Sequence, residues 1–508
     1  MARPAIVFIG FMGAGKSTAL AAARRAGLET TEIDELMETA LGKPIQQAFE
    51  EDGEEAFRAR EAEVVGRLLT QADGGAIALG GGSVLLPRVR EALGRHIVVL
   101  LEIDAKEAWR RIEGTPRPLA TSEVDVAALL AERLPLYEEL ADAVVPMADP
   151  RVVARALPAI QGLGEMPEGT RLLWAPSASG DYPVFVGRGV LRSDWWPLES
   201  RRFCISDENC APYAEAIGAF AGHAKIAPGE ASKTLEQVNA VIRQMADEGM
   251  TREDHVVAVG GGVVGDLAGF CAHIYQRGVP VVQVPTTVVA QVDSAYGGKT
   301  GVDVGELKNY AGAYHQPAMV LTDVSTLESL PQRDLAAGFV EVIKTALLAG
   351  GSLWERVRDM ETIDPAGLDD LVFACARYKC GVVAADERDG GLRHVLNLGH
   401  TVGHAIEGAS GYLYLHGEAI GLGLLAALRL SDAPELRDEV ETILARHDLP
   451  IRNERGGPLD PILDILQHDK KRTAAGVGFV LLSEPGQPRT GQLVEEARVR
   501  EAVQELYP

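Results

Sequence analysis

The sequence predicts an α/β protein of two α/β domains followed by a helix-rich segment. Three observations lead to this prediction. The chain has 508 residues, which is more than one hydrophobic core usually supports. Short apolar runs at 5–9, 76–79 and 97–101 alternate with helical patterns. A glycine-rich turn separates the first run from a helix rich in Ala and Arg. Alternating strands and helices indicate a parallel sheet with helices on both faces.

The domain boundaries follow from the order of these patterns. We expect a first α/β domain over residues 1–160 and a linker over 161–170, where the stretch GLGEMPEG is rich in Gly and Pro. Strand-like runs at 183–186, 203–206, 256–259, 281–284 and 319–322 predict a second α/β domain over 171–324. The pattern then becomes helical, which predicts an α-helical domain over 325–508.

Composition excludes several classes of partner. The chain is 46% hydrophobic and 24% charged, and its formal net charge is -24. An acidic balance of this size argues against nucleic acid and anionic membranes, which require an extended basic surface. Small anionic substrates remain compatible with it. Five scattered cysteines without CxxC spacing are typical of reduced thiols, and no apolar run approaches transmembrane length, so we expect a cytoplasmic protein.

The segment GFMGAGKS at 10–17 matches the phosphate-binding pattern GxxxxGK[ST] between an expected strand and an expected helix. Its glycines allow successive backbone N–H groups to converge on phosphate oxygens. Lys16 is expected to reach the β- and γ-phosphates, and Ser17 to place its hydroxyl on Mg²⁺. The residues predicted to bind ATP are Gly13, Ala14, Gly15, Lys16, Ser17 and Thr18.

With the motifs TEIDELME, AFRARE, LGGG, TPRPLA and RLPLYEELA, residues 1–160 resemble the shikimate kinase family. The resemblance implies a P-loop kinase in which Lys16, Asp34 and Arg117 are catalytic, Arg117 closing over the phosphates. It implies that shikimate is bound by Asp34, Arg58, Gly80, Gly81, Gly82 and Arg133. Glu32 stands where the family usually has Asp. The alternative is a nucleotide-binding regulatory module without turnover, for which Glu32 is the support.

Two further motifs lie in the second α/β region. VGGGVVGDLAGFCA at 259–272 is a glycine run after an expected strand, which permits a pyrophosphate to approach the backbone but also fits a tight turn. QVPTTVVAQVDSAYGGKTGVDVGELKNYAG at 283–312 combines threonine hydroxyls with Asp293, Lys299, Lys308 and Asn309. Clustered lysines beside glycines favour a phosphorylated or carboxylated ligand.

A metal site is predicted in the helical region. Glu341 and Lys344 are three residues apart, His400 and His404 are four apart, and each pair therefore shares one helical face. His416 follows closely, in a protein that contains only 11 histidines. A carboxylate with several imidazoles is the donor set of a catalytic Zn²⁺-type site.

In content and order, these motifs over residues 180–508 resemble the 3-dehydroquinate synthase family. The resemblance implies a Rossmann-type α/β domain with a C-terminal α-helical domain, NAD as cofactor, and Zn²⁺ or Co²⁺ held by Glu341, His400 and His416. It implies NAD binding by Asp207, Glu230, Lys233, Gly261, Gly262, Asp266, Thr286, Thr287, Lys299 and Lys308. It implies substrate contacts from Asp293, Lys299, Lys308, Asn309, Lys344, Lys379, Arg393, Asn397, His404 and Lys471, with Lys299, Lys344 and His404 catalytic.

The same resemblance implies a homodimer, because Arg277 matches an arginine that is presented to the neighbouring subunit's site. Asp389 stands where the family commonly has Glu. The implied activities are ATP-dependent 3-phosphorylation of shikimate and cyclisation of 3-deoxy-D-arabino-heptulosonate 7-phosphate to 3-dehydroquinate with phosphate release. A related sugar-phosphate cyclase and a polyol dehydrogenase are the alternatives for this half. The phosphate-facing Lys299, Lys308 and Lys344 count against the dehydrogenase, and Arg393, as a carboxylate-binding group, counts against the other cyclase.

Overall fold

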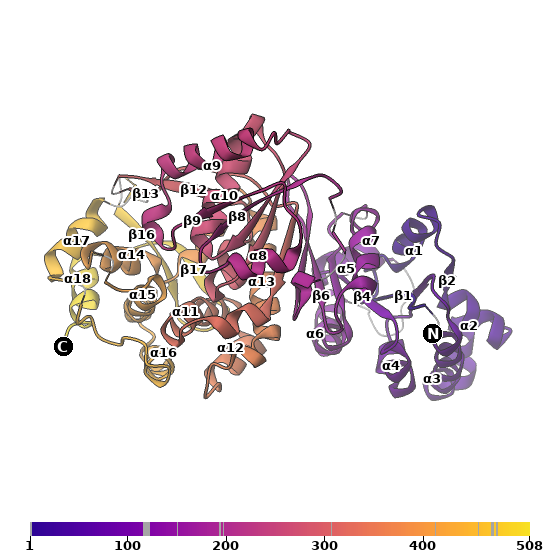
Figure 1. Cartoon of the computed structure of the whole chain (residues 1–508). Coiled ribbons are helices and arrows are strands. Elements are labelled where there is room, and N and C mark those ends of the chain that lie inside the picture. Colours follow the sequence, from indigo (N-terminus) through magenta and orange to yellow (C-terminus); the bar gives the residue numbers. More distant parts are fainter. Residues whose placement is uncertain are drawn as a thin grey trace. The chain divides into compact units, whose positions relative to one another are not determined.

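The computed structural model describes residues 3–114, 122–149, 151–192, 195–196, 198–305, 307–411, 413–455, 457–468, 472–473 and 476–508. The chain divides into two compact units (Figure 1). Unit 1 contains residues 1–175, 182–185 and 193–197, and unit 2 contains residues 176–181, 186–192 and 198–508. The strand β7 (Tyr182–Gly187) crosses this division.

Unit 1 is built on parallel strands in the order β2-β3-β1-β4-β5-β6, with helices on both faces (Figure 1). Its central strands are continuous apolar runs buried on both sides, as parallel strands require. The strands are β1 (Ile6–Ile9), β2 (Thr30–Glu32), β3 (Ala76–Ala78), β4 (Ile97–Glu102), β5 (Ala143–Pro146) and β6 (Arg171–Ala175), and the helices are α1 (Lys16–Arg25), α2 (Ile33–Leu41), α3 (Ile45–Gln71), α4 (Pro87–Leu93), α5 (Ala105–Ile112), α6 (Glu123–Leu140) and α7 (Val152–Gly162).

Unit 1 extends beyond the domain end expected at residue 160. Helix α7 continues to Gly162, a 3₁₀ turn follows, and Leu163 and Met166 are buried. Strand β6 then pairs with β5, so the stretch expected as a linker packs within the unit. The apolar side chains between its glycines and proline are the physical reason, because burying them stabilises the connection more than leaving it solvated.

Unit 2 contains parallel strands in the order β14-β11-β10-β8-β9. Helices α9 and α10 pack on these strands through a buried apolar cluster that includes Val241, Val256 and Leu267. The strands are β8 (Arg202–Asp207), β9 (Gly222–Ile226), β10 (His255–Gly260), β11 (Val281–Pro285) and β14 (Met319–Asp323), the helices are α8 (Ala211–Ile217), α9 (Leu235–Asp247) and α10 (Gly262–Ile274), and β12 (Lys299–Val304) pairs with β13 (Leu307–Tyr314) as an antiparallel hairpin.

The remainder of unit 2 is mainly helical, as the sequence predicts, and its last helices gather at the C-terminal end in yellow (Figure 1). Helices α11 and α15 are buried along most of their length and form the centre of this region. The elements are α11 (Gln332–Ala349), α12 (Gly351–Arg358), α13 (Asp369–Ala385), α14 (His400–Ala409), α15 (His416–Leu430), α16 (Pro434–Arg446), α17 (Leu459–His468) and α18 (Glu496–Gln504), with the short antiparallel strands β15 (Arg472–Thr473), β16 (Gly476–Leu482) and β17 (Pro488–Leu493).

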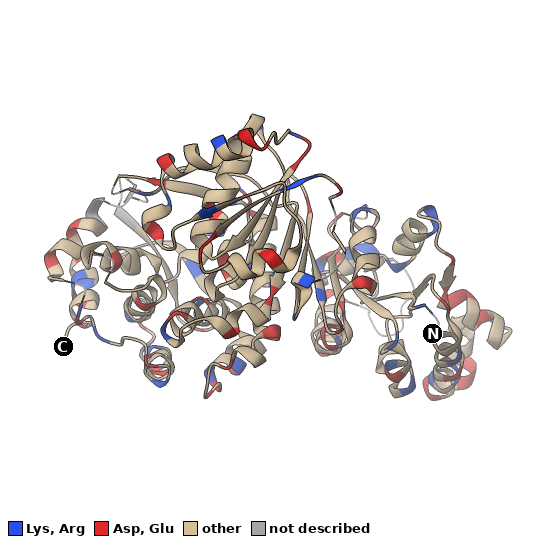
Figure 2. Cartoon of the chain, viewed as in Figure 1, with Lys and Arg blue, Asp and Glu red and all other residues tan. Residues whose placement is uncertain are grey.

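Charged residues are distributed over both units. Figure 2 shows acidic and basic residues interspersed on the outer helices, with many acidic residues on α2 and α3. Within the described residues, every helix is too short or too polar to span a bilayer.

Candidate active sites

A carboxylate and three imidazoles meet where α11, α14 and α15 pack together. Glu341 on α11 is fully buried, and its Oε1 lies 3.2 Å from His416 Nε2 and 3.5 Å from His400 Nε2. His404 lies one turn after His400 on α14, and one ring nitrogen of each histidine falls within 4.8 Å of those of the other two. The predicted metal ligands therefore converge from three helices.

The pKa shifts of His400 and Glu341 favour the forms that bind a divalent cation. Burial and the nearby Lys344 hold the pKa of His400 well below its usual range, so its imidazole is neutral. Burial alone would raise the pKa of Glu341, but Lys344 and the imidazoles outweigh it and hold that pKa well below the usual range. A neutral imidazole and an ionised carboxylate are the forms that bind metal. Burial would lower the pKa of His416, but Glu341 and Glu407 raise it to about 9, so a proton now occupies a position that a cation would take.

Glycines allow the three helices to approach this closely. A Cβ on Gly417, the residue after His416, would lie 1.7 Å from the carbonyl oxygen of Ala337 on α11. A Cβ on Gly423 would lie 2.0 Å from the carbonyl oxygen of Gly399, which immediately precedes α14. Such distances are far inside van der Waals contact, so only glycine lets α15 pack backbone to backbone against both neighbours.

Buried charges of both signs surround the carboxylate side of this cluster. Asp293 lies on the π-helical turn η6 (Ala290–Ser294), and its Oδ2 is 3.2 Å from Lys344 Nζ, while Lys344 Nζ is 2.5 Å from Glu341 Oε2. Lys379 on α13 donates to both the carbonyl and the carboxylate of Asp293. Burial would raise the pKa of Asp293, but the two lysines lower it to about 2. Both lysines are thus fixed beside the metal-type donors.

The residues predicted to bind NAD lie at the carboxyl ends of parallel strands. Asp207 ends β8, Gly261 follows β10, and Thr286 follows β11. A Cβ on Gly261 would lie 3.0 Å from Thr287 Cγ2, and one on Gly262 would lie 3.1 Å from Ser294 Oγ, so glycine lets the turn after β10 pack closely against the segment that follows β11. Ligands of open α/β sheets bind at this edge, where a helix N-terminus favours phosphate.

Ion pairs organise the same edge. Lys233 is buried and lies 2.6 Å from Asp266 Oδ2 and 3.7 Å from Glu230 Oε1. Lys308 on β13 lies 3.9 Å from the same Glu230 oxygen and 3.0 Å from Glu407 Oε1 on α14. Charged contacts therefore connect the predicted cofactor edge with the histidine cluster.

In unit 1, the phosphate-binding loop follows β1. Lys16 Nζ donates to the carbonyls of Gly10, at 2.8 Å, and Phe11, at 3.1 Å. Gly13 and Gly15 both have positive φ, at 78° and 91°, which the loop requires of glycine. The hydroxyl of Ser17, the predicted Mg²⁺ ligand, donates to the carboxylate of Glu32 at the end of β2.

The predicted shikimate residues form a second group beside this loop. Arg58 Nη1 is 2.6 Å from Oε2 of the buried Glu61, and a Cβ on Gly82 would lie 2.6 Å from Arg58 Nη2. The Tyr137 hydroxyl donates to the Gly81 carbonyl at 2.6 Å. Arg133 is buried, and its Nε lacks a hydrogen-bond partner among the described residues. An unpaired buried guanidinium nitrogen fits an anionic ligand.

Comparison with known proteins assigns both units. The models of the 3-dehydroquinate synthase N-terminal and C-terminal domains match residues 223–337 and 338–472. The 3-dehydroquinate synthase of Symbiobacterium thermophilum is 40% identical over 330 residues, which cover 60% of this chain and 92% of that protein. The chain belongs to the 3-dehydroquinate synthase family. The enzyme of the same description from Desulforamulus reducens is also 40% identical, over 63% of this chain and 95% of that protein.

The synthase unit also resembles a solved structure. The crystal structure of 2-deoxy-scyllo-inosose synthase complexed with carbaglucose-6-phosphate, NAD⁺ and Co²⁺ is 26% identical, with a TM-score of 0.60, over 66% of this chain and 99% of that chain. The shikimate kinase family model matches residues 12–160 of unit 1. The chain is therefore a shikimate-pathway enzyme that joins a shikimate kinase to a 3-dehydroquinate synthase.

Other predicted residues of the synthase lie on strands and 3₁₀ turns outside the three helices of the histidine cluster. Arg277 is exposed at the end of a 3₁₀ turn with φ of 74°, and Asn309 is exposed on β13 with φ of 49°. Asn397 is partly buried just before α14. Lys299 on β12 pairs with Asp389. Two predicted residues, Arg117 and Lys471, lie outside the described residues.

Predicted ATP- and shikimate-binding residues that the structure describes lie together at one edge of the sheet in unit 1. Lys16, Ser17 and Thr18 open α1, directly after the buried Ala14 of the loop. Asp34 lies in the first turn of α2, where its Oδ1 would be 3.9 Å from a Cβ placed on Gly80. The phosphate loop, Asp34 and the 80–82 glycines therefore lie at the carboxyl ends of β1, β2 and β3.

Some residues at these sites were missed by the sequence prediction. Glu407 pairs with both Lys308 and His416, and its spacing, three residues after His404 on α14, was the available signal. Glu61, three residues after Arg58, has the same signal. Arg111 donates to the carbonyls of Gly13, at 3.2 Å, and of Met147, at 2.7 Å. Arg111 follows Arg110 directly, and nothing in the sequence indicates which of the two contacts the loop.

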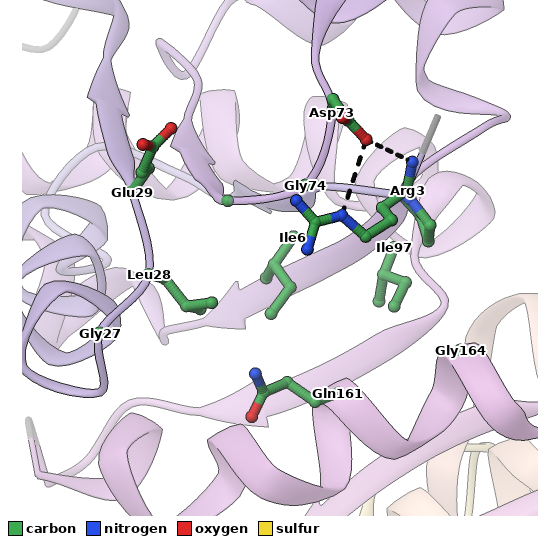
Figure 3. Close-up of a pocket in the computed structure, with 12 residues that line it drawn as sticks. Arg3, Ile6, Gly27, Leu28, Glu29, Asp73, Gly74, Ile97, Gln161 and Gly164 are labelled. Carbon is green, nitrogen blue, oxygen red and sulfur yellow. Dashed lines mark hydrogen bonds and ion pairs between the residues drawn. The ribbon is translucent and has the colours of Figure 1, made fainter. Parts of the chain in front are cut away.

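Two cavities lie in the kinase unit. One, of about 690 Å³, is lined by Glu102, Asp104, Glu107, Arg110 and other residues at the carboxyl ends of β4 and β5, next to the phosphate loop. The other, of about 370 Å³, lies at the amino-terminal edge of β1 and β4, where Arg3 pairs with Asp73 (Figure 3). The second cavity contains none of the predicted site residues.

Proposed function

We propose that the synthase unit converts 3-deoxy-D-arabino-heptulosonate 7-phosphate into 3-dehydroquinate with release of phosphate, using NAD⁺ and a divalent metal. The kinase unit transfers the γ-phosphoryl group of ATP to the 3-hydroxyl of shikimate. The observation that carries the synthase proposal is the convergence of Glu341, His400 and His416 beside the buried Lys344–Asp293 pair.

Glu341, His400 and His416 would hold Zn²⁺ or Co²⁺, since their donor atoms suit either ion and His416 would lose its proton when the cation binds. The related 2-deoxy-scyllo-inosose synthase contains NAD⁺ and Co²⁺, which supports the same cofactors here. When bound, NAD⁺ supplies reversible hydride acceptance and the metal supplies Lewis acidity toward substrate oxygens. The residues that would hold NAD⁺ are those at the carboxyl ends of β8, β10 and β11.

The chain's own residues supply orientation, charge and proton transfer. Lys344 stays charged inside the protein because Asp293 and Glu341 outweigh the burial that would lower its pKa. It and Lys379 offer fixed N–H donors to substrate hydroxyl oxygens. Arg393 is assigned to the substrate carboxylate, and Lys299, Lys308 and Asn309 to phosphate groups. His404, exposed on the face of α14 that carries His400, is placed to exchange a proton with the substrate.

For the kinase, Lys16 and Arg117 are assigned to the transferring phosphoryl group. Asp34 would accept the hydrogen bond of the attacking hydroxyl, and Arg58 and Arg133 would pair with the shikimate carboxylate. Ser17 would bind Mg²⁺. The hydrogen bond between Ser17 and Glu32 places the longer carboxylate of Glu32 where it can support that ion directly or through water.

We assign Arg277 to the active site of a second subunit, so the working enzyme would be a homodimer through its synthase half. The exposed position and left-handed backbone of Arg277 are consistent with a side chain held outward for another chain. Analytical ultracentrifugation tests this assignment directly: a synthase that is fully active as a monomer would overturn it.

The deciding experiment measures phosphate release from the heptulosonate phosphate by the purified chain with NAD⁺, with and without a chelator. NADH absorbance is followed in parallel. Metal-dependent phosphate release with no accumulating NADH is expected. Accumulating NADH without phosphate would instead indicate a polyol dehydrogenase, and phosphate release only from another heptulose phosphate would indicate a related cyclase.

The kinase proposal has its own assay in the same preparation. ATP-dependent phosphorylation of shikimate is expected in the wild-type chain and is lost in Lys16→Ala and Asp34→Asn. The synthase activity of those variants serves as the control for folding. Nucleotide binding without phosphorylation in the wild-type chain would instead identify unit 1 as a regulatory module.

A further inference from the structure

The loop between β6 and β7, residues 176–181, contacts a turn that carries predicted substrate groups. Ser179 N–H donates to Glu387 Oε2 at 3.0 Å, and the Ser179 hydroxyl donates to Glu387 Oε1. The two residues are 208 positions apart in the sequence and belong to the same compact unit. Glu387 is buried, whereas Ser179 lies at the surface. The loop therefore holds both carboxylate oxygens of a buried acid.

The backbone of Glu387 in turn orients Arg393. Arg393 is 3% exposed, and its Nη1 donates to the Glu387 carbonyl at 2.7 Å while Nη2 donates to the Gly297 carbonyl at 3.0 Å. A Cβ on Gly297 would lie 2.7 Å from Arg393 Nη2, so that residue must be glycine. Two backbone carbonyls thus fix the plane of the guanidinium group, and one of them belongs to the residue that Ser179 anchors.

The turn from Asp386 to Arg393 is held by bonds within it and by contacts from the hairpin, where the Tyr314 hydroxyl donates to the Arg388 carbonyl at 3.2 Å. The Asp386 carboxylate accepts from the backbone N–H groups of Gly390, at 2.8 Å, Gly391, at 2.9 Å, and Arg393, at 3.0 Å. Asp389, at the tip with φ of 62°, pairs with Lys299. These bonds fix the internal shape of the turn. The side chain of Glu387 connects the turn to a different part of the unit.

We propose that Ser179 is a positioning residue of the synthase, which acts through Glu387 to hold Arg393 in the orientation that binds the substrate carboxylate. The inference rests on the proposed function, because it takes Arg393 as a substrate-binding group. Burial would raise the pKa of Glu387, but hydrogen bonds led by that of Ser179 lower it, so the anchored carboxylate is ionised. Charge-assisted bonds of this kind are stronger than neutral ones.

The test compares Ser179→Ala with Ser179→Thr, which keeps the hydroxyl, and with Thr442→Ala, which removes an exposed hydroxyl on α16. In Ser179→Ala, KM for the heptulosonate phosphate rises on the order of tenfold, as expected for a lost bond to a charged group, while kcat changes little. Ser179→Thr restores most of the affinity, and Thr442→Ala matches the wild type. Shikimate phosphorylation by the same chain stays unchanged and reports an intact fold.

Hydrogen exchange supplies a readout that needs no substrate. The amides of Gly390, Gly391 and Arg393 exchange faster in Ser179→Ala than in the wild type, because the Glu387 carboxylate loses the hydroxyl bond that helps to anchor the turn. Unchanged exchange of these amides would overturn the proposal. So would an unchanged KM in Ser179→Ala, whether or not kcat falls. If the wild-type chain released no phosphate from this substrate, the proposed function would fail, and the exchange rates would still decide whether Ser179 holds the turn.

Discussion

Replacing Gly417 by Ala should strongly weaken metal binding by the synthase. In a helix, Gly→Ala ordinarily stabilises by about 1 kcal/mol. Here the added Cβ would lie 1.7 Å from the Ala337 carbonyl oxygen, and a separation of 3.0 Å is the least that such atoms tolerate. The start of α15 must therefore move by about 1.3 Å away from α11. His416 begins α15, so it moves with it relative to Glu341.

The size of that movement sets the expected effect. Metal–donor distances tolerate about 0.2 Å, so a shift several times larger should weaken metal binding by at least about 100-fold. Overpacking of this kind costs about 1–3 kcal/mol of stability. We expect loss of phosphate release at limiting metal, a modest fall in Tm and unchanged shikimate phosphorylation.

Metal affinity is measured by competition with a chromophoric chelator. Gly381→Ala is the matched control, because Gly381 lies in α13 with no heavy atom within 4 Å of an added Cβ. It should bind metal like the wild type. If Gly417→Ala did so as well, close packing of α15 on α11 would not be what positions the ligand.

Three further predictions concern the charged groups. Glu407→Gln should weaken metal binding about 10–100-fold, because Glu407 faces the Nδ1 of His416 and carboxylates in that position orient metal-binding imidazoles. Competition with a chelator measures the metal affinity, and an unchanged affinity would contradict this prediction. Lys344→Met should destabilise the synthase by about 3–5 kcal/mol, because it removes the buried lysine that the carboxylates of Glu341 and Asp293 share; denaturant unfolding measures it. Asp293 has a pKa lowered to about 2, so its stabilisation is present above its ordinary pKa of 3.8 and is lost as pH falls from there toward 2. In Lys344→Met the pKa of Asp293 should be less depressed, so this pH-dependent loss of stability should be smaller, and an unchanged pH dependence of stability below 3.8 would argue against the pairing. Lys16→Ala should reduce shikimate phosphorylation by more than about 100-fold through lost phosphate stabilisation, with phosphate release by the synthase unaffected; a parallel loss of both activities would mean that the substitution damages the whole chain.

The sequence predicted the fold well because its signals are local. Continuous apolar runs mark the buried parallel strands of both units, and the helical pattern after residue 325 is confirmed by α11–α18. The C-terminal boundary of unit 1 could not be predicted from such local signals. The stretch 161–170 has linker composition, yet Leu163 and Met166 are buried, and a glycine-rich stretch looks the same whether or not its few apolar side chains find a surface to pack on.

In the candidate sites, too, the sequence indicates local arrangements but not contacts between distant elements. Helical spacing predicted that His400 and His404 share a face, and the structure brings them to Glu341 as the motif suggested. No spacing rule indicates that Lys379 reaches Asp293 from 86 residues away, or that Ser179 reaches Glu387. The resemblance supplied Lys379, but nothing supplied Ser179, because a contact between distant elements depends on packing that only the folded chain defines.

The synthase site resolves an apparent conflict between its many lysines and a net charge of -24. Each lysine described there already pairs with a carboxylate: Lys344 and Lys379 with Asp293, Lys308 with Glu407, and Lys299 with Asp389. The side chain of Lys299 is 51% exposed, and exposed pairs are weak, so an incoming phosphate would displace Asp389 from it at little cost, whereas the Glu407 partner of Lys308 is only 8% exposed. The Lys344 pair is buried, and separating it would leave charges without solvent. Lys299 is therefore suited to exchange its partner for the substrate, and the Lys344 pair to remain as the fixed part of the site.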